Sequence, residues 1–225
     1  ERVKALRESA HPQAQFIWAL LRNAFHYAAV TLESIAESAR EVDFAMRWGF
    51  GMKQGPFEIW QEAGWKQVAE WVKADIDSGK ALSKAPLPAW VFDGRDGVHT
   101  AEGSWSPKTG KYVPIRDLPV YKRQAFRENV LGSQAPNAAT AGKTLFEDAN
   151  IRLWTLDDEV VIASIKSKMH TISAEVTAGL AKGLEIAEAG YKGMVIWTQD
   201  GPFSAGADLQ SMMPAFMSGG GKAIA

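Results

Sequence analysis

The spacing of apolar residues changes along this chain, and the change limits the folds that it can adopt. Across 15–36, apolar residues recur at the intervals of one helix face. The repeating residues are Ile17, Leu20, Leu21, Ala24, Ala28, Leu32 and Ile35. Across 160–165 and 193–199 they form short β-branched runs, which are typical of buried strands. The sequence therefore predicts a helical first part and a second part in which strand, helix and strand form an α/β layer.

Start and stop signals divide the first part into several helices. Ser38 and Glu41 have the spacing of a capping box, and Gly49 stands where a helix often ends. Pro56 suits the first turn of another helix, and Gly64 separates that helix from the next. The first part is therefore predicted to be mainly helical.

The middle of the chain, 78–150, has the composition of turns and loops, with runs such as KAPLPAW, DGRDG and GSQAPNAATAG. It also holds Trp90 and Trp105, so we expect part of it to pack as a lobe or hairpin and the rest to be a linker. In the second part, ISAEVTAGLAKGLEIAEAG predicts a helix with Val176 and Leu184 among its inward residues.

Composition argues against several classes of protein. A net charge of −1 over 225 residues gives no electrostatic reason to expect nucleic acid or an acidic membrane as a partner. The chain has no cysteine, which fits a cytoplasmic protein, and no apolar run long enough for a membrane span or a signal peptide. It does not begin with Met, so we expect it to be part of a longer protein.

Several motifs of known chemistry are matched only in part. The glycines of GFGMKQG follow a predicted helix rather than a strand, and the third is one residue late for a dinucleotide fingerprint. GGGK lacks the first glycine and the Ser or Thr of a phosphate loop. The four histidines have no metal-ligand spacing, and no G-x-S-x-G elbow is present. Neither a nucleotide, a metal nor a serine nucleophile is therefore indicated.

The run GPFSAGADLQSM follows the second predicted strand and opens a new helix. Its small residues, Ala205, Gly206 and Ala207, would expose backbone N–H groups at the start of that helix. Such donors can stabilise the oxyanion that forms when a thioester carbonyl becomes an enolate. A tight strand-to-helix turn without a ligand explains the same residues, and the pattern leaves both interpretations open.

The runs VVIASIKSKMHTIS and GMVIWTQDGPFSAGADLQSM resemble the first half of an enoyl-CoA hydratase, or crotonase-family, domain. FSAGADL matches that family's A-G-A-D-[IL] motif. SKMHTIS matches the start of its CoA site, although a histidine stands where the family usually has a small polar residue. The resemblance implies that the backbone N–H of Ala207 is one donor of an oxyanion hole. It also implies substrate- or CoA-binding roles for Lys168, Met169, His170, Ala205, Gly206, Asp208 and Leu209.

The run EVDFAMRWGFGMKQGPFEIWQEAG resembles the C-terminal helical domain of 3-hydroxyacyl-CoA dehydrogenases, with the pattern D-x-A-M-x-x-G-x-G-x-x-x-G-P-F. The resemblance implies helices that pack under the acyl chain and take part in dimer formation. The matching residues are then structural: Asp43, Ala45, Met46, Gly49, Gly55, Pro56 and Phe57. Together the two resemblances imply a multidomain fold. They imply an all-α dehydrogenase C-terminal-like domain with an irregular extension at 1–130, a linker at 131–150, and part of an α/β crotonase-like (ββα) domain at 151–225.

Dehydrogenase followed by hydratase is a domain order of large fatty acid β-oxidation enzymes, so the resemblance implies an internal fragment of a bifunctional enzyme. The parent would hydrate trans-2-enoyl-CoA and oxidise 3-hydroxyacyl-CoA with NAD, as a homo-oligomer without a metal. The fragment itself is expected to be inactive. The NAD domain would precede Glu1, and no Asp or Glu follows Asp208 to act on water. The alternatives are a non-catalytic dimerisation or scaffold module, and part of an enoyl-CoA isomerase-type crotonase.

Overall fold

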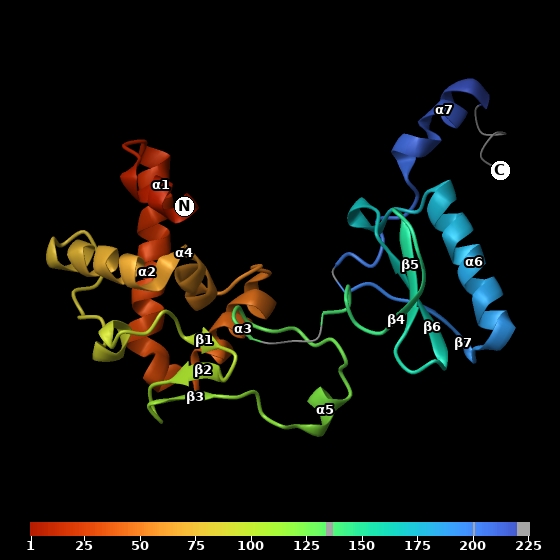
Figure 1. The fold of residues 1–225 in the computed structure, drawn as a ribbon. Helices are drawn as coiled ribbons and strands as arrows, with labels where there is room; N and C mark the ends of the chain where they lie inside the picture. The colour runs from red at the N-terminus through yellow and green to blue at the C-terminus, as the bar shows by residue number, and fades with distance from the viewer. Residues whose placement is uncertain (134–136, 200, 220–225) are drawn as a thin grey trace. The chain divides into compact units, whose positions relative to one another are not determined.

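The computed structural model describes residues 1–133, 137–199 and 201–219, which form two compact units, Glu1–Ala135 and Pro136–Ala225 (Figure 1). Each unit has a hydrophobic core of its own. Within these described ranges, every helix is too short or too polar to cross a membrane.

Helices build most of the first unit, as the start and stop signals predict. They are α1 (Arg2–Glu8), α2 (Pro12–Ile35), α3 (Ala39–Phe50) and α4 (Pro56–Asp77). At the start of α3 the Glu41 carboxylate accepts a hydrogen bond from the Ser38 N–H at 2.8 Å. Helix α3 ends later than predicted, because Gly51 and not Gly49 takes the left-handed C-cap conformation, with φ 66°. Gly64 interrupts α4 with φ 104°, which explains the predicted break.

Helix α2 buries a different face from the one that its apolar repeat predicts. Its buried residues are Trp18, Arg22, Phe25, His26, Ala28, Ala29 and Leu32. Of the predicted repeat, Ala28 and Leu32 are buried, whereas Ile17, Leu20 and Ile35 are exposed. The helix is apolar on more than one side, so its periodicity alone does not identify the core face.

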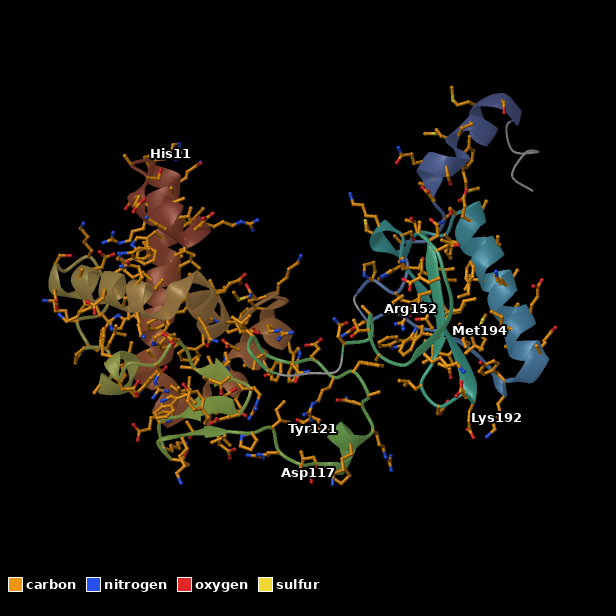
Figure 2. All side chains as sticks on the ribbon, viewed as in Figure 1. His11, Asp117, Tyr121, Arg152, Lys192 and Met194 are labelled. Atoms are coloured by element: carbon orange, nitrogen blue, oxygen red, sulfur yellow. The ribbon has the colours of Figure 1, made fainter. Side chains whose placement is uncertain are left out.

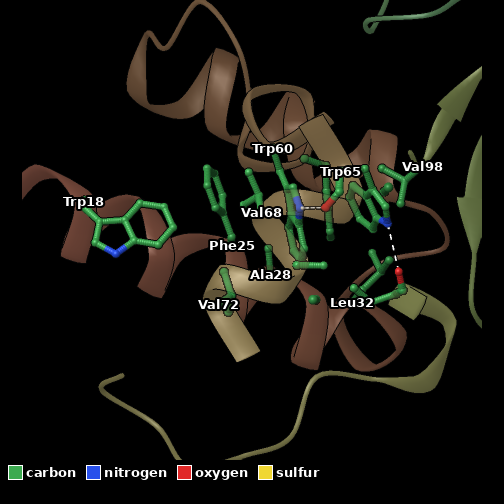
Figure 3. Close-up of a cluster of buried hydrophobic side chains, with 14 residues drawn as sticks. Trp18, Phe25, Ala28, Leu32, Trp60, Trp65, Val68, Val72 and Val98 are labelled. Carbon is green, nitrogen blue, oxygen red and sulfur yellow. Dashed lines mark hydrogen bonds between the residues drawn. The ribbon is translucent and has the colours of Figure 1, made fainter. Parts of the chain in front are cut away.

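Indole rings dominate the core of the first unit (Figure 3). The rings of Trp60 and Trp65 stack with centroids 4.3 Å apart, Trp90 stacks on Trp65 at 6.2 Å, and Trp105 lies 6.3 Å from Trp90. Trp60 Nε1–H donates to the carbonyl of Trp65 at 2.9 Å, and Trp65 Nε1–H donates to that of Val91 at 3.0 Å. These four tryptophans form an indole ladder that joins α4 to the extension after it, and backbone carbonyls accept from the indole N–H groups of Trp60 and Trp65.

The extension after α4 belongs to the first unit and carries a small sheet. Its elements are η1 (Ala89–Phe92), β1 (His99–Thr100), β2 (Gly103–Ser106), β3 (Lys111–Val113) and α5 (Pro119–Lys122). The three strands pair antiparallel in the order β1-β2-β3. The expectation of an all-α first domain is therefore wrong, while the lobe or hairpin expected around the aromatic residues is this sheet.

A buried hydrogen-bond network ties the sheet to the helices. His99 Nε2 lies 2.6 Å from Asp43 Oδ2, and His99 Nδ1 lies 2.8 Å from Ser104 Oγ. The Asp43 carboxylate also accepts hydrogen bonds from the N–H groups of Phe57 and Glu58, at 2.9 and 3.2 Å, and so caps α4. Burial raises the pKa of Asp43, and the hydrogen bond from His99 opposes that rise. This carboxylate holds the sheet and α4 together.

The second unit is a sheet with a helix packed against it and another helix after it. Its main elements are β4 (Lys143–Glu147), β5 (Ile151–Thr155), β6 (Val160–Ile165), α6 (Ala174–Gly190), β7 (Gly193–Ile196) and α7 (Leu209–Gly219). The strand order is β4-β5-β6-β7, with β7 parallel to β6 and the other pairs antiparallel. Helix α6 forms the predicted crossover. Strand β4 lies inside the range predicted as a linker, because it is only five residues long and has turn residues on both sides.

Small residues set the contact between α6 and the sheet. A Cβ atom on Gly179 would stand 2.5 Å from Ile151 Cγ2, and one on Gly183 would stand 2.7 Å from Met194 Sδ. The buried face of α6 therefore runs through Val176 and these glycines, since only glycine fits so close to the strands. Leu184, predicted to face inward, is 52% exposed, because the row of glycines lies on the sheet in its place.

Arg152 fixes the segment that leads into β4 (Figure 2 labels Arg152 on the sheet). Its buried guanidinium donates to the carbonyls of Ala138, Ala139 and Ala141 at 2.7, 3.1 and 2.8 Å. Its Nε–H donates to Thr144 Oγ1 at 2.9 Å. Arg152 therefore helps to hold the residues just before β4 against the sheet of the second unit.

Candidate functional site

Two loops of the second unit meet at one edge of its sheet. The first follows β6 and contains the 3-10 turn η2 (Lys168–His170), and the second follows β7 and leads into α7. A parallel bridge joins Ile172 of the first loop to Ala207 of the second. Because β6 and β7 are parallel, both loops leave the carboxyl ends of their strands, where α/β sheets bind ligands. The two segments that the sequence predicts as a site are therefore brought together.

Backbone hydrogen bonds join the two loops. The Ile172 N–H donates to the Gly206 carbonyl at 2.8 Å, and the Asp208 N–H donates to the Ile172 carbonyl at 2.9 Å. A third bond runs from the Ala205 N–H to the Met169 carbonyl at 3.1 Å. The backbone N–H groups of Ala205 and Asp208 are thus used within the protein.

The N–H of Ala207 is left free by this pairing. In a parallel bridge the central residue directs its N–H away from the segment that it pairs with. No acceptor for this N–H lies among the residues that the structure describes. Ala207 is exposed, and Gly206 before it has no side chain and takes φ 88°, a conformation that favours glycine. The loop therefore offers the N–H of Ala207 as a donor to a molecule that approaches from solvent.

His170 holds the second loop in place. Its Nδ1–H donates to the Pro202 carbonyl at 2.7 Å, and its own carbonyl accepts from Ser204 Oγ at 2.7 Å. Ser204 Oγ in turn accepts from the Gly206 N–H at 3.0 Å. Met169 and His170 both have positive φ angles, 56° and 51°, which are uncommon for residues with side chains. The histidine, a departure from the crotonase pattern, thus has a structural role between the loops.

The other predicted binding residues surround this pair of loops. Lys168, Met169 and Leu209 are exposed, and Lys168 makes no ion pair within the described ranges. Asp208 is engaged as the cap of α7, where its Oδ1 accepts a hydrogen bond from the Gln210 N–H at 3.1 Å. The expected contacts of these residues with CoA remain predictions.

Glu175 is a carboxylate near these loops that the sequence interpretation missed. It stands in the first turn of α6, where its Oε2 accepts a hydrogen bond from Ser173 Oγ at 2.7 Å. This bond lowers the pKa of Glu175, and the negative charge of Asp208 acts in the opposite direction. The spacing of Ser173 and Glu175 at a predicted helix start could have revealed it. Because the carboxylates of Glu175 and Asp208 are both hydrogen-bonded at helix starts, we assign neither a role in proton transfer.

The described residues do not fit a metal or a dinucleotide. Among them, no cluster of His, Asp and Glu side chains could hold a metal ion. The glycines of GFGMKQG serve the helices instead, since Gly51 ends α3 and Gly55 precedes α4. A Cβ on Gly55 would stand 2.3 Å from Asp43 Cα, so this glycine permits tight packing within the protein and not the approach of a phosphate.

No protein-family model matches the chain. The chain is 28% identical over 212 residues to a probable 3-hydroxyacyl-CoA dehydrogenase of Bacillus subtilis (strain 168), a match that covers 94% of this chain and 25% of that protein. Among solved structures, a 3-hydroxybutyryl-CoA dehydrogenase from Escherichia coli K12 substr. MG1655 matches 80% of this chain and 41% of its own. That match has 16% identity and a TM-score of 0.29. The chain is thus similar in sequence to a 3-hydroxyacyl-CoA dehydrogenase across both units, and it spans a quarter of that relative's length.

Proposed function

We propose that this chain is part of an acyl-CoA-oxidising enzyme of the 3-hydroxyacyl-CoA dehydrogenase kind, and that its second unit binds the thioester oxygen of the substrate. The observation that carries this proposal is the free, exposed N–H of Ala207 between two loops that are otherwise tied by hydrogen bonds. The sequence similarity to a 3-hydroxyacyl-CoA dehydrogenase, which runs through both units, supports the choice of substrate.

A fixed backbone donor suits the chemistry of a thioester. When a proton leaves the carbon beside the carbonyl, or water adds to a conjugated double bond, negative charge develops on the thioester oxygen. A donor that already points at that oxygen stabilises the charge without reorganisation. One such donor lowers the activation barrier by about 2.7–4 kcal/mol. His170, through Pro202 and Ser204, keeps the loop that carries the donor in place.

The proposed parent enzyme hydrates trans-2-enoyl-CoA and oxidises 3-hydroxyacyl-CoA with NAD, and this chain supplies only parts of the two sites. NAD accepts the hydride of the oxidation when it is bound. The described residues of this chain contain no turn that fits it, since Gly51 and Gly55 are used in helix ends and packing. We assign the first unit a supporting role for the dehydrogenase and the second unit the thioester contact.

The contact with oxygen can be tested by comparing two ligands that differ only in the carbonyl oxygen, which two hydrogen atoms replace in the second ligand. A butyryl-CoA thioester and the matching butyl-CoA thioether should be titrated into the chain by calorimetry, with NAD as a third ligand. A hydrogen bond from Ala207 predicts that the thioester binds about threefold to tenfold more tightly than the thioether. NAD should not bind.

Substitution at the donor provides the second arm of the test. In Ala207→Val the added methyl groups obstruct the approach to the N–H, so the preference for the thioester should disappear. Ala205→Val is the matched control, because its N–H is already taken by the Met169 carbonyl. Equal affinity for thioester and thioether in the unaltered chain would contradict the proposed contact and favour a scaffold module.

A further inference from the structure

The positive charge of this chain is concentrated in one segment of the first unit. Residues 108–127 contain six of the 25 Lys and Arg residues of the chain and one acidic residue, Asp117. The six cations are Lys108, Lys111, Arg116, Lys122, Arg123 and Arg127. The rest of the chain is therefore acidic, and the net charge of −1 averages over two regions of opposite sign. A positive segment attracts anionic partners even when the whole chain is nearly neutral.

Four of the six cations stand on a loop whose two ends are fixed. This loop, 115–127, is here called the cationic loop, and it runs out from β3 to α5 and returns toward α3 (Figure 1). Before it, the buried Arg40 donates from Nη2 to the Pro114 carbonyl at 3.1 Å. After it, Arg47 donates from Nη1 to the Asn129 carbonyl at 2.9 Å. None of the residues of the cationic loop is buried, so its side chains face solvent from a fixed base.

Two aliphatic side chains stand near the middle of the cationic loop, on either side of Pro119. Leu118 is 40% exposed and Val120 is 55% exposed. Lys122 and Arg123 follow them directly, and both are exposed. An apolar tip that is followed at once by cations is the arrangement with which peripheral segments enter the headgroup region of anionic lipids.

Further cations gather around Tyr121, which Figure 2 labels. The Arg127 guanidinium lies over the Tyr121 ring, with Cζ 5.8 Å from the ring centroid. Arg116 pairs with Glu37, and the charges of Arg116 and Lys108 together lower the pKa of that carboxyl. Both partners of the Arg116–Glu37 pair are exposed, and such pairs contribute little to stability. Arg116 can therefore exchange this carboxylate for a phosphate, which its planar guanidinium fits equally well.

A lipid surface fits this composition better than a protein surface or a nucleic acid does. Lysine is depleted in protein–protein interfaces, which argues against a buried contact with another part of a longer chain. At a lipid surface the ammonium groups stay among hydrated headgroups while their stems lie along apolar atoms. A nucleic acid contacts its partner mainly through phosphates, sugars and base edges, and these give no apolar layer for Leu118 and Val120.

We propose that the cationic loop docks on an anionic phospholipid surface. Leu118 and Val120 enter at the level of the headgroups, and the Lys and Arg side chains lie beside the lipid phosphates. Two aliphatic side chains and a few cations give a reversible contact. The first unit alone makes this contact, so it does not depend on the thioester contact of the second.

Co-sedimentation with vesicles tests the contact on the unaltered chain. Vesicles of phosphatidylcholine and phosphatidylserine in equal amounts should bind the chain, and vesicles of phosphatidylcholine alone should not, because they carry no net charge. Binding should weaken as the salt concentration rises, since salt screens the attraction. Equal binding to both kinds of vesicle, or to neither, would refute the proposal. Binding to a short single-stranded DNA but not to the mixed vesicles would assign the cations to nucleic acid instead.

Charge reversal tests whether the cationic loop makes the contact. Each Lys or Arg near an anionic surface strengthens binding about fivefold, so Lys122→Glu combined with Arg123→Glu should weaken binding at least about 25-fold. The matched control combines Lys66→Glu with Lys73→Glu, which changes the net charge equally at exposed positions of α4. The control should weaken binding by less than about threefold, since these charges lie outside the contact. Circular dichroism verifies that both variants fold. Equal weakening by the two pairs would mean that overall charge and not the loop binds the vesicles.

A fluorescent label at the tip of the loop tests whether it enters the lipid. The chain has no cysteine, so Val120→Cys can carry one environment-sensitive fluorophore. Ala74→Cys, at an exposed position of α4, carries the same label as the control. With the mixed vesicles the emission of the label at 120 should shift to shorter wavelength, and that of the label at 74 should not. An unchanged emission at 120 on vesicles that bind the chain would overturn the insertion of the tip.

Discussion

Replacing Arg152 should release the segment before β4 from the sheet of the second unit. The buried guanidinium donates to three backbone carbonyls and to Thr144 Oγ1, with distances of 2.7–3.1 Å. In Arg152→Met the aliphatic part of the side chain is kept and all of these donors are lost. While the segment stays closed in this variant, the less buried carbonyls of Ala139 and Ala141 can bind water instead. Ala138 is buried, however, and its carbonyl loses its partner without gaining one.

The expected change follows from these contacts. A hydrogen bond to a charged group contributes about 1.5–3 kcal/mol net, and the acceptors that reach water recover part of this. The free energy of opening the segment should therefore fall by about 2–4 kcal/mol, which is about a 30- to 700-fold increase in opening. The free energy of opening in Arg152→Lys should lie between that of the unaltered chain and that of Arg152→Met, since one ammonium group cannot reach all four acceptors.

Amide hydrogen exchange measures this opening. The amides of Ala138 and Ala141 are suitable probes, because they donate to Gln199 Oε1 at 3.3 Å and to the Asn137 carbonyl at 2.9 Å. Lys166→Met is the matched control, since it removes an exposed cation directly after strand β6 and should cost less than about 1 kcal/mol. The reasoning fails if Arg152→Met changes exchange at these amides less than about threefold, or no more than Lys166→Met does.

Two further predictions concern the buried network of the first unit. Gly55→Ala places a Cβ 2.3 Å from Asp43 Cα, a backbone atom that cannot move aside. The free energy of unfolding, followed by tryptophan fluorescence, should therefore fall by about 3 kcal/mol or more. A fall of less than about 1 kcal/mol would show that the backbone shifts to make room. Burial raises the pKa of Asp43 from its ordinary 3.8, so the stability that its protonated form contributes is present below that value and is lost as pH rises through the folded-state pKa. The unfolding free energy of the unaltered chain minus that of Asp43→Asn should therefore fall with rising pH and then level off. A difference that grows with pH in urea titrations would mean that the bonds from His99 and the amides outweigh burial.

Local signals in the sequence predicted the helices of the first unit well. Capping residues act within a few positions of themselves, so Ser38, Glu41 and Pro56 stand in the structure where their spacing places them. Strands β1 to β3 could not be read in the same way, because they are two to four residues long, and the buried positions of β2 are the polar residues Ser104 and Ser106. Their position depends on His99 reaching Asp43 across 56 residues, and a local pattern does not contain that contact.

The buried side of a helix was harder to predict than the helix itself. In α2 the apolar repeat pointed to residues such as Leu20 and Ile35, which are exposed, because two sides of the helix are apolar. In α6 the interpretation favoured large residues such as Leu184, whereas glycines make the closest contact with the sheet. Hydrophobic size thus identified a helix in both cases but only part of the side that packs, such as Leu32 in α2 and Val176 in α6.

The sequence predicted the two segments of the candidate site but not the contacts between them. The small residues around Ala207 could be read directly from the sequence. The bridge to Ile172, the bond from His170 to Pro202 and the position of Glu175 depend on two parallel strands delivering their loops to one edge. Which backbone donor remains free follows from that pairing alone.

The indole ladder also means that the first unit accounts for most of the tryptophan fluorescence of the chain. Seven of the nine tryptophans of the chain lie before residue 106, and the two closest rings, Trp60 and Trp65, are nearly parallel, with 17° between their planes. Chromophores stacked at 4.3 Å share their excited states, so light absorbed by one ring of the ladder can be emitted by another. A quencher placed at either end of the ladder would dim the emission of the whole row. Fluorescence of this protein is therefore mainly a record of whether its helical unit is folded.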